Sequence, residues 1–188
     1  MGLLVYLVEM GKVIHKILAI LLISIICISA IFLELDRVQA FSGGNGTSGD
    51  PYQITTPDEL QSLNNYLGSG HSGKYFKVMN DLNLSVSPYN TGNGWTPIGS
   101  SSNRFYGKFN GNYKTITGLF INTPSSTYRG LFGYIASGAI VENTLLTDVN
   151  VTASSYDGAL AGENDGTVQN AGVIGGTVVG GMRTGGLV

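Results

Sequence analysis

The sequence predicts an all-β protein, a right-handed parallel β-helix (solenoid) with a short capping α-helix near its N-terminus. Three observations predict it: a glycine-rich, charge-poor composition, a repeat of about 27 residues, and one well-signalled helix ahead of that repeat. The chain has 28 glycines in 188 residues, and charged residues make up only 12% of it, against about 25% in an ordinary globular protein. Valine, isoleucine, leucine and tyrosine remain plentiful, so the composition favours short strands joined by tight turns over a disordered chain.

Residues 1–40 read as an export signal. Lys12 and Lys16 form a basic region, Ile17–Leu33 is an uncharged apolar run, and Val38–Ala40 is a small-x-small cleavage motif. We therefore expect cleavage after Ala40; the alternative is an uncleaved anchor, because an apolar run of this length can just span a bilayer. Met10 is an alternative start. Cys27 lies inside the apolar run, so the cleaved chain would contain no cysteine and no disulfide.

Residues 41–74 are predicted to form an N-terminal cap with a helix over about 57–67. Thr56 is a typical N-cap residue, Pro57 suits the first helical position, and Glu59 completes a Thr-x-x-Glu capping box. An apolar face then follows at helical spacing, made by Leu60, Leu63, Tyr66 and Leu67. We expect this face to cover the open end of the solenoid core, as terminal caps do in repeat proteins.

Residues 75–188 are predicted to form the β-helix, with strands at Tyr75–Val78, Leu82–Leu84 and Phe105–Phe109 before the repeat. One motif aligns Thr115–Gly118, Ile140–Asn143 and Thr167–Asn170, so that Ile116, Val141 and Val168 become equivalent positions. A second motif aligns Gly130–Gly133, Ala159–Gly162 and Gly186–Val188, and both motifs drift around the same period. Since a strand advances ~3.3 Å per residue, one repeat suits one coil of three short strands.

Stacked coils make specific predictions about neighbours. Val141 should lie over Val168 and Leu131 over Leu160, and Asn143 and Asn170 should form a short amide ladder at one turn. Parallel crossovers are right-handed in nearly all cases, which predicts the hand. Leu187 and Val188 open a repeat that is not completed, so we expect residues 41–188 to be a fragment, truncated at the C-terminus, that self-associates through that end.

The same residues carry a family resemblance. Gly158–Asn170 resembles the GLUG motif, roughly Gly-Gly-Leu-Val-Gly-x-Asn-x-Gly-x-Ile-x-Asn, although Ala159 and Ala161 replace a Gly and a Val. Gly185–Val188 resembles the opening of a further copy, and Gly130–Gly133 a degenerate one. The upstream stretch resembles the leading segment of such proteins at Gly49–Ile54, Asn80–Leu82, Trp95–Gly99 and Phe109–Gly111. The resemblance implies a bacterial secreted or cell-surface protein with a role in adhesion or carbohydrate contact. Some GLUG repeats also accompany the catalytic domain of IgA-cleaving zinc peptidases.

No catalytic, cofactor-binding or metal-binding residues are predicted. A zinc peptidase needs two histidines one helical turn apart with a glutamate base, whereas His15 lies in the leader and His71 in a loop. A glycosidase needs paired carboxylates, whereas Asp81, Glu142, Asp148 and Asp157 are scattered singly along the chain. Glu163–Gly166 offers oxygens for loose calcium binding, but an Asx-type turn is favoured there. The glycosylation acceptors Asn45, Asn83 and Asn150 are interpreted as turn-rich sequence.

Aromatic residues beside loops are the remaining candidates for ligand contact: Tyr89, Trp95, Tyr106, Tyr113 and Tyr128. They would either stack on sugars or pack over the ends of coils. The net charge of −2 gives no basic footprint for nucleic acid, and membrane contact is expected only through an uncleaved leader.

The leading hypothesis is a non-catalytic, adhesin-like module that binds surface glycans or host or cell-wall components. The alternatives are the repeat region of a larger secreted enzyme, either a zinc peptidase or glycan-active, and a structural spacer. The catalytic domain of the enzyme alternative would lie outside this sequence.

Overall fold

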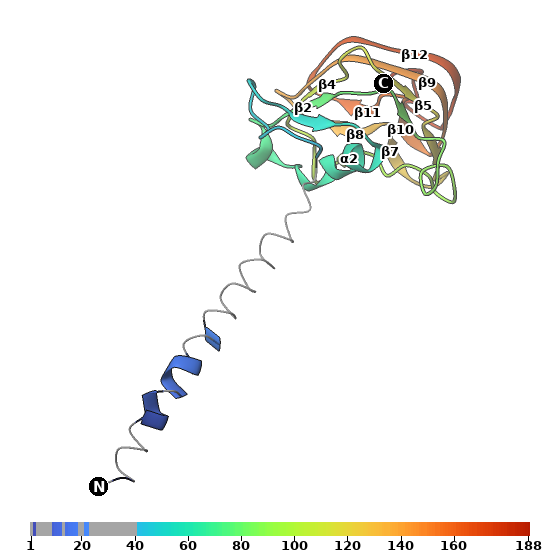
Figure 1. Ribbon diagram of the computed structural model, residues 1–188. Helices are drawn as coiled ribbons and strands as arrows, with labels where there is room; N and C mark the ends of the chain where they lie inside the picture. The colour runs from blue at the N-terminus through green and yellow to red at the C-terminus, as the bar shows by residue number, and fades with distance from the viewer. Residues whose placement is uncertain (1, 3–8, 13, 19–20, 23–40) are drawn as a thin grey trace. The chain divides into compact units, whose positions relative to one another are not determined.

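The computed structural model describes residue 2, residues 9–12, 14–18 and 21–22, and the whole of residues 41–188 (Figure 1). It divides into two units, Met1–Ala40 and Phe41–Val188. The predicted cleavage motif at Val38–Ala40 and most of the apolar run lie outside the described residues. Within the described residues no helix combines the length and the apolar character that a membrane crossing requires.

Phe41–Val188 is a parallel β-solenoid, as predicted. The first column of strands stacks β1 (Tyr52–Ile54), β2 (Tyr75–Val78), β4 (Lys108–Asn110), β9 (Ile140–Thr152) and β12 (Thr167–Val179), every pair parallel. Side chains alternate along each strand, so Phe76, Phe109 and Val141 point inward and are at most 1% exposed.

The coils of this column differ in length. The stacked partners Glu142 and Gln169 are separated by 27 positions in the sequence, whereas Asn110 and Glu142 are separated by 32. In this column the period predicted from the repeat therefore describes only the last coil.

Two further columns complete the broad side of each coil. The second stacks β3 (Leu82–Asn83) on β5 (Thr115–Thr117), and the third begins with β6 (Phe120–Asn122); both continue onto β9 and then β12. Figure 1 shows β9 and β12 as long neighbouring bands that run around the coil. The coil returns through β7 (Thr127–Arg129) under β10 (Ser155–Asp157), and through β8 (Phe132–Ile135) under β11 (Ala161–Asn164).

Each coil turns at positions with left-handed backbone conformation. Asn143 and Asn170, with φ of 52° and 50°, occupy the first corner, and Gly118, Asp148 and Gly175 share the second at 75°, 53° and 74°. Tyr128, Tyr156 and Arg183, at 60°, 58° and 58°, share the third. A residue with a Cβ is strained in this region unless local contacts compensate it, so recurrence across coils indicates that stacking holds these corners in place.

The predicted ladder at the first corner is confirmed. Asn170 Nδ2 donates to Asn143 Oδ1 at 3.1 Å, and Asn143 Nδ2 donates to Asn110 Oδ1 at 3.2 Å. The ladder therefore spans three coils and includes Asn110, which the repeat alignment did not identify.

One predicted register is wrong. Val141 lies beside Val168, and Leu131 lies beside Leu160, as predicted. Ile116, however, pairs with Leu146, and Phe109 is the residue beside Val141. The reason lies in corner length, because the corner from Phe109 to Ile116 is two positions longer than the corner from Val141 to Leu146. An insertion of two keeps both strands facing the core, since side-chain direction alternates with a period of two.

The helix is shorter than predicted. The capping box is present, with Glu59 N donating to Thr56 Oγ1 and the Glu59 carboxylate accepting from Thr56 N, but α2 spans only Pro57–Gln61. Ser62–Asn65 continues as a 3-10 helix. Residues three apart share a face in an α-helix and in a 3-10 helix, so Leu60 of α2 and Leu63 of the 3-10 helix both face inward, and both are fully buried.

An aromatic cluster that was not predicted sits beside α2. Phe41 stacks on Tyr52 with ring centroids 4.8 Å apart and touches Tyr66 and Phe76 at 5.4 and 5.6 Å. The series continues inside the solenoid from Phe76 through Phe105 to Phe132 and Phe109. This end of the core is therefore filled by large rings, which contribute more buried area per residue than aliphatic side chains.

Candidate functional site

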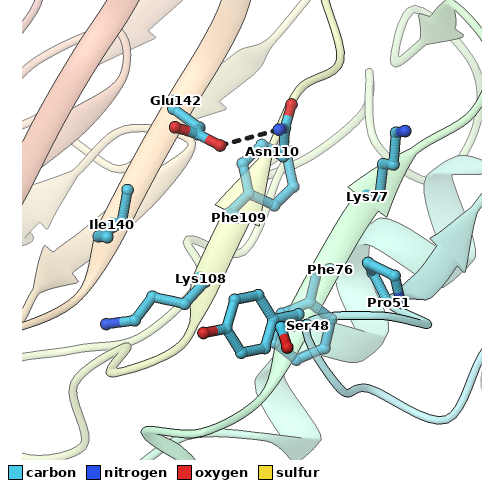
Figure 2. A pocket seen from close by; sticks show the side chains of 10 residues that line it. Ser48, Pro51, Phe76, Lys77, Lys108, Phe109, Asn110, Ile140 and Glu142 are labelled. Carbon is cyan, nitrogen blue, oxygen red and sulfur yellow. Dashed lines mark hydrogen bonds between the residues drawn. The ribbon is translucent and has the colours of Figure 1, made fainter.

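The outer surface of the first column of strands carries a groove of about 350 Å³ (Figure 2). Its floor is formed by β2, β4 and β9, and one wall by the loop that contains Ser48 and Pro51. The groove is lined by Ser48, Pro51, Tyr75, Phe76, Lys77, Lys108, Phe109, Asn110, Ile140 and Glu142.

Strand alternation places the polar lining residues in two rows across the sheet. In one row Tyr75 lies beside Lys108 and Lys108 beside Ile140; in the other Lys77 lies beside Asn110 and Asn110 beside Glu142. The second row continues to Gln169 on β12. Residues directly opposite on neighbouring strands are about 5 Å apart, so each row is a continuous line of side chains.

Hydrogen bonds fix the second row. Asn110 Nδ2 donates to Glu142 Oε1 at 2.8 Å, and Gln169 Nε2 donates to Glu142 Oε2 at 2.6 Å. Figure 2 shows the Asn110–Glu142 contact across the strands. Both oxygens of the only carboxylate that lines the groove thus accept from amides on neighbouring coils, which orients the Glu142 side chain across the strands.

The two lysines of the groove lack carboxylate partners. Within the part of the chain that the structure describes, the ion pairs are Lys12–Glu9 and Arg104–Asp165. Lys108 Nζ donates to the carbonyl of Gly138, and an ammonium group has three protons to donate. In Figure 2 the ammonium groups of Lys77 and Lys108 point away from each other and away from Glu142.

The carboxylates considered from the sequence do not converge. Asp81 Oδ1 accepts from Thr115 N at 2.9 Å at a turn before β3, and Asp148 occupies the second corner. Asp157 is fully buried between Arg129 and Thr184, its register partners in the third-corner column. Burial raises the pKa of Asp157, although hydrogen bonds from Arg129 and Thr184 and the Arg129 charge oppose the shift. Among the described residues, no three His, Cys, Asp or Glu side chains group as metal ligands do.

The Glu163–Gly166 segment is the predicted Asx-type turn. Asn164 Oδ1 accepts from Gly166 N at 3.0 Å. Asp165 Oδ2 accepts from Tyr134 Oη at 2.7 Å and lies 3.3 Å from Arg104 Nη1. The hydrogen bond to Asp165 raises the pKa of Tyr134 to about 12, with burial and the acidic neighbours adding to it. Asn164 Oδ1 and Asp165 Oδ2 therefore already have partners within the protein.

Other turn residues behave in the same way. Asn45 Oδ1 accepts from Thr47 N, and Asn83 Oδ1 accepts from Ser85 N. Asn150 differs, because it lies within strand β9 and is exposed, so the interpretation as turn sequence is wrong there. The ring of His71 packs edge-on against Tyr66, and its Nδ1 is buried without a hydrogen-bond partner among the described residues.

The aromatic candidates divide into packing residues and surface residues. Trp95 is 2% exposed and donates from Nε1 to Leu131 O at 3.1 Å, and Tyr89 packs on it at 5.3 Å. These two are structural. Tyr106 is half-buried, and Tyr113 is 75% exposed at the first corner.

Tyr128 belongs to a stack that sequence reasoning missed. Its ring lies 4.6 Å from that of Tyr156 with the planes 20° apart, and the Arg183 guanidinium covers Tyr156 at 4.7 Å. A signal was present in the sequence, because Tyr128, Tyr156 and Arg183 recur at nearly the repeat period, each shortly before the second repeat motif. The groove residues carry no such signal, since the intervals that separate Tyr75, Lys108 and Ile140 are longer than that period and unequal.

Comparison with known proteins gives two relatives. No family profile matches the chain, and no solved structure matches it. Over 161 residues, 83% of the chain, it is 39% identical to a protein of Evansella cellulosilytica described as a Gly-rich membrane protein, and the match covers 18% of that protein. Over 151 residues, 77% of the chain, it is 32% identical to halomucin of Haloquadratum walsbyi, covering 2% of it. The chain thus spans less than a fifth of either relative.

Proposed function

We propose that this chain is a non-catalytic, secreted or cell-surface interaction module, adhesin-like, that contacts carbohydrate through the groove over β2, β4 and β9. The observation that carries the proposal is the lining of the groove. An aromatic ring, two amine cations, an amide and a single hydrogen-bonded carboxylate suit recognition of a polar polymer.

Two further observations support this reading. Hydrolysis of a glycosidic bond requires a pair of carboxyl groups about 5 to 10 Å apart, and Glu142 is the only carboxylate among the lining residues. The relatives are described as a Gly-rich membrane protein and as halomucin, and both descriptions fit a location at or outside the cell surface. Membership of the GLUG family and removal of the leader after Ala40 belong to the same proposal.

The alternative is the repeat region of a larger secreted enzyme. Both relatives are much longer than the matched region, since it covers only 18% and 2% of them. A catalytic domain elsewhere in a longer parent protein would be compatible with everything in residues 41–188.

The test is a panel of neutral and acidic soluble polysaccharides, scored in parallel for binding and for release of reducing ends. We expect saturable binding of at least one polymer without turnover. Reproducible turnover that is lost on Asp81→Asn or Asp148→Asn would overturn the non-catalytic proposal, and failure to bind any polymer would overturn the carbohydrate role.

A further inference from the structure

We infer that the groove over β2, β4 and β9 selects acidic polysaccharides, with Lys77 and Lys108 binding the carboxylates or sulfates and Tyr75 packing on the sugar ring between them. This inference rests on the proposed function and names the ligand class. The inference starts from the charge of the two lysines, because neither Lys77 nor Lys108 forms an ion pair with an acidic side chain among the described residues.

The placement of the two lysines fits a polymer better than a single anion. Lys77 faces Asn110 on the neighbouring strand, and Lys108 faces Tyr75, so the cations stand on adjacent strands in different rows. Diagonal neighbours of this kind have Cα atoms about 7–8 Å apart, and Figure 2 shows the two ammonium groups diverging. Two separated cations match charges repeated along a chain, whereas one bound phosphate would require them to converge.

The charge of Glu142 does not cancel this preference. Each of its oxygens accepts an amide hydrogen bond, from Asn110 at 2.8 Å and from Gln169 at 2.6 Å. The groove therefore presents two unpaired cations and one partly satisfied anion, on a chain whose net charge is −2. A local reversal of sign relative to the whole molecule is what electrostatic selection of an anionic ligand requires.

Tyr75 provides the contact that distinguishes sugar from other anions. It lines the groove, is half-buried, and is the direct neighbour of Lys108 across the strands. An aromatic side chain combines an apolar face with a polar tip, which suits the apolar face of a sugar ring beside its charged substituent.

The experiment measures binding of the full chain, captured through a C-terminal tag that leader removal cannot detach, to four polymers: polygalacturonate, dextran sulfate, neutral dextran and poly-L-glutamate. We expect binding to polygalacturonate or dextran sulfate, with the stronger of the two identifying the anionic group, and weaker binding to the other polymers. Binding should fall as salt rises from about 50 to 500 mM, because exposed charges are screened over about 10 Å or less.

Substitutions locate the site. Lys77→Gln and Lys108→Gln should each lower the affinity for the acidic polysaccharide about fivefold, as loss of roughly 1 kcal/mol does. Lys114→Gln makes the same charge change outside the groove and should have no effect. Glu142→Gln should leave the affinity for the acidic polysaccharide unchanged or raise it. Tyr75→Ala should lower that affinity, whereas Tyr75→Phe, which keeps the aromatic ring, should retain the affinity of the parent protein.

Each other outcome has a defined meaning. Equal binding of neutral dextran would overturn the charge selection and leave the proposed carbohydrate role standing. Equal binding of poly-L-glutamate would show recognition of charge alone and overturn the assignment of a sugar ligand. Binding that survives both lysine substitutions would place the site elsewhere.

Discussion

Strands β9 and β12 have the same length and pair side by side in parallel, yet their side chains differ in burial. Val141, Leu146 and Val151 of β9 pair with Val168, Val173 and Val178 of β12. The three β9 side chains are fully buried, whereas their β12 partners are only half-buried and Ile174 is 63% exposed. Pattern and register are thus the same, and burial depends on whether a strand has a neighbour on both sides.

The two ends of the solenoid show the same contrast. At the N-terminal end, Leu60, Leu63 and the rings of Phe41 and Phe76 fill and cover the core. At the C-terminal end, Thr167–Val179 contains three glycines and offers mostly small side chains. Stability in a solenoid is approximately a sum over neighbouring coils, so equivalent substitutions should cost more at the covered end.

The largest expected effect is at the cap. Leu63→Asp should destabilise the fold by about 2 to 5 kcal/mol, because it buries an unpaired charge. Val173→Asp, at a half-buried position of β12, should cost much less. Thermal and urea unfolding of both variants measure the difference, and an unchanged transition for Leu63→Asp would mean that this face of the cap is not buried in solution.

A matched pair of deletions in one column should give the next largest difference. Val141→Ala removes fully buried methyl groups and should cost about 2 kcal/mol, whereas Val168→Ala should cost under about 1 kcal/mol. The same unfolding measurements apply. Equal losses would show that β12 is covered in solution, for instance by self-association, which sedimentation would detect.

Glu59 in the cap and Asp157 in the third-corner column should make the free energy of unfolding depend on pH with opposite signs. Burial tends to raise the pKa of Glu59, but hydrogen bonds from Ser42, Thr55 and Thr56 outweigh it and the net pKa is lowered. Its stabilising contribution is therefore present above the unfolded-state pKa of about 4.3 and lost as pH falls through the folded-state value. Glu59→Gln should cost about 1 kcal/mol at pH 7 and progressively less in acid, as urea unfolding across that pH range would show.

Asp157 has a raised pKa, so its folded state retains the proton to a higher pH than the unfolded chain. Stability from this group is present below the unfolded-state pKa of about 3.9 and is lost as pH rises through the folded-state value. Asp157→Asn should therefore be at least as stable as the parent at pH 7 in urea unfolding, with the difference vanishing below about pH 4. A large loss at pH 7 would show that the Arg129 charge and the hydrogen bonds to Asp157 outweigh the cost of burying the carboxylate.

The smallest effect is expected at the first corner. Asn143→Ala removes a rung between Asn110 and Asn170 and leaves a Cβ-bearing residue at φ of 52°, at a cost of about 1 kcal/mol in thermal unfolding. Asn170→Ala leaves alanine at a similar φ of 50° but removes only one hydrogen bond of the ladder, so it should cost less. Asn143→Gly is the control, since glycine tolerates the backbone angle and isolates the contribution of the side-chain hydrogen bonds.

The sequence predicted the features that depend on near neighbours. The Thr56–Glu59 capping box, the Asn164 turn and the in-out alternation of Tyr75–Val78 are set by residues only a few positions apart. The repeat of Val141 and Val168 was also detectable, because that coil contains no insertion. These signals were sufficient for the fold class.

Where a coil contains a long insertion, only the tertiary structure showed which residues become neighbours on adjacent coils. The segment from Leu84 to Gly107 lengthens one coil, and the longer corner at Asn112 and Tyr113 sets Ile116 beside Leu146. The groove exists only because those insertions place Tyr75, Lys108 and Ile140 in one row. The local sequence pattern specifies which face of the strand a side chain takes, whereas loop length and packing specify its neighbours on adjacent coils. The burial of Trp95 and the presence of Lys77 and Lys108 in one groove depend on loop length and packing, so the sequence pattern alone did not predict them.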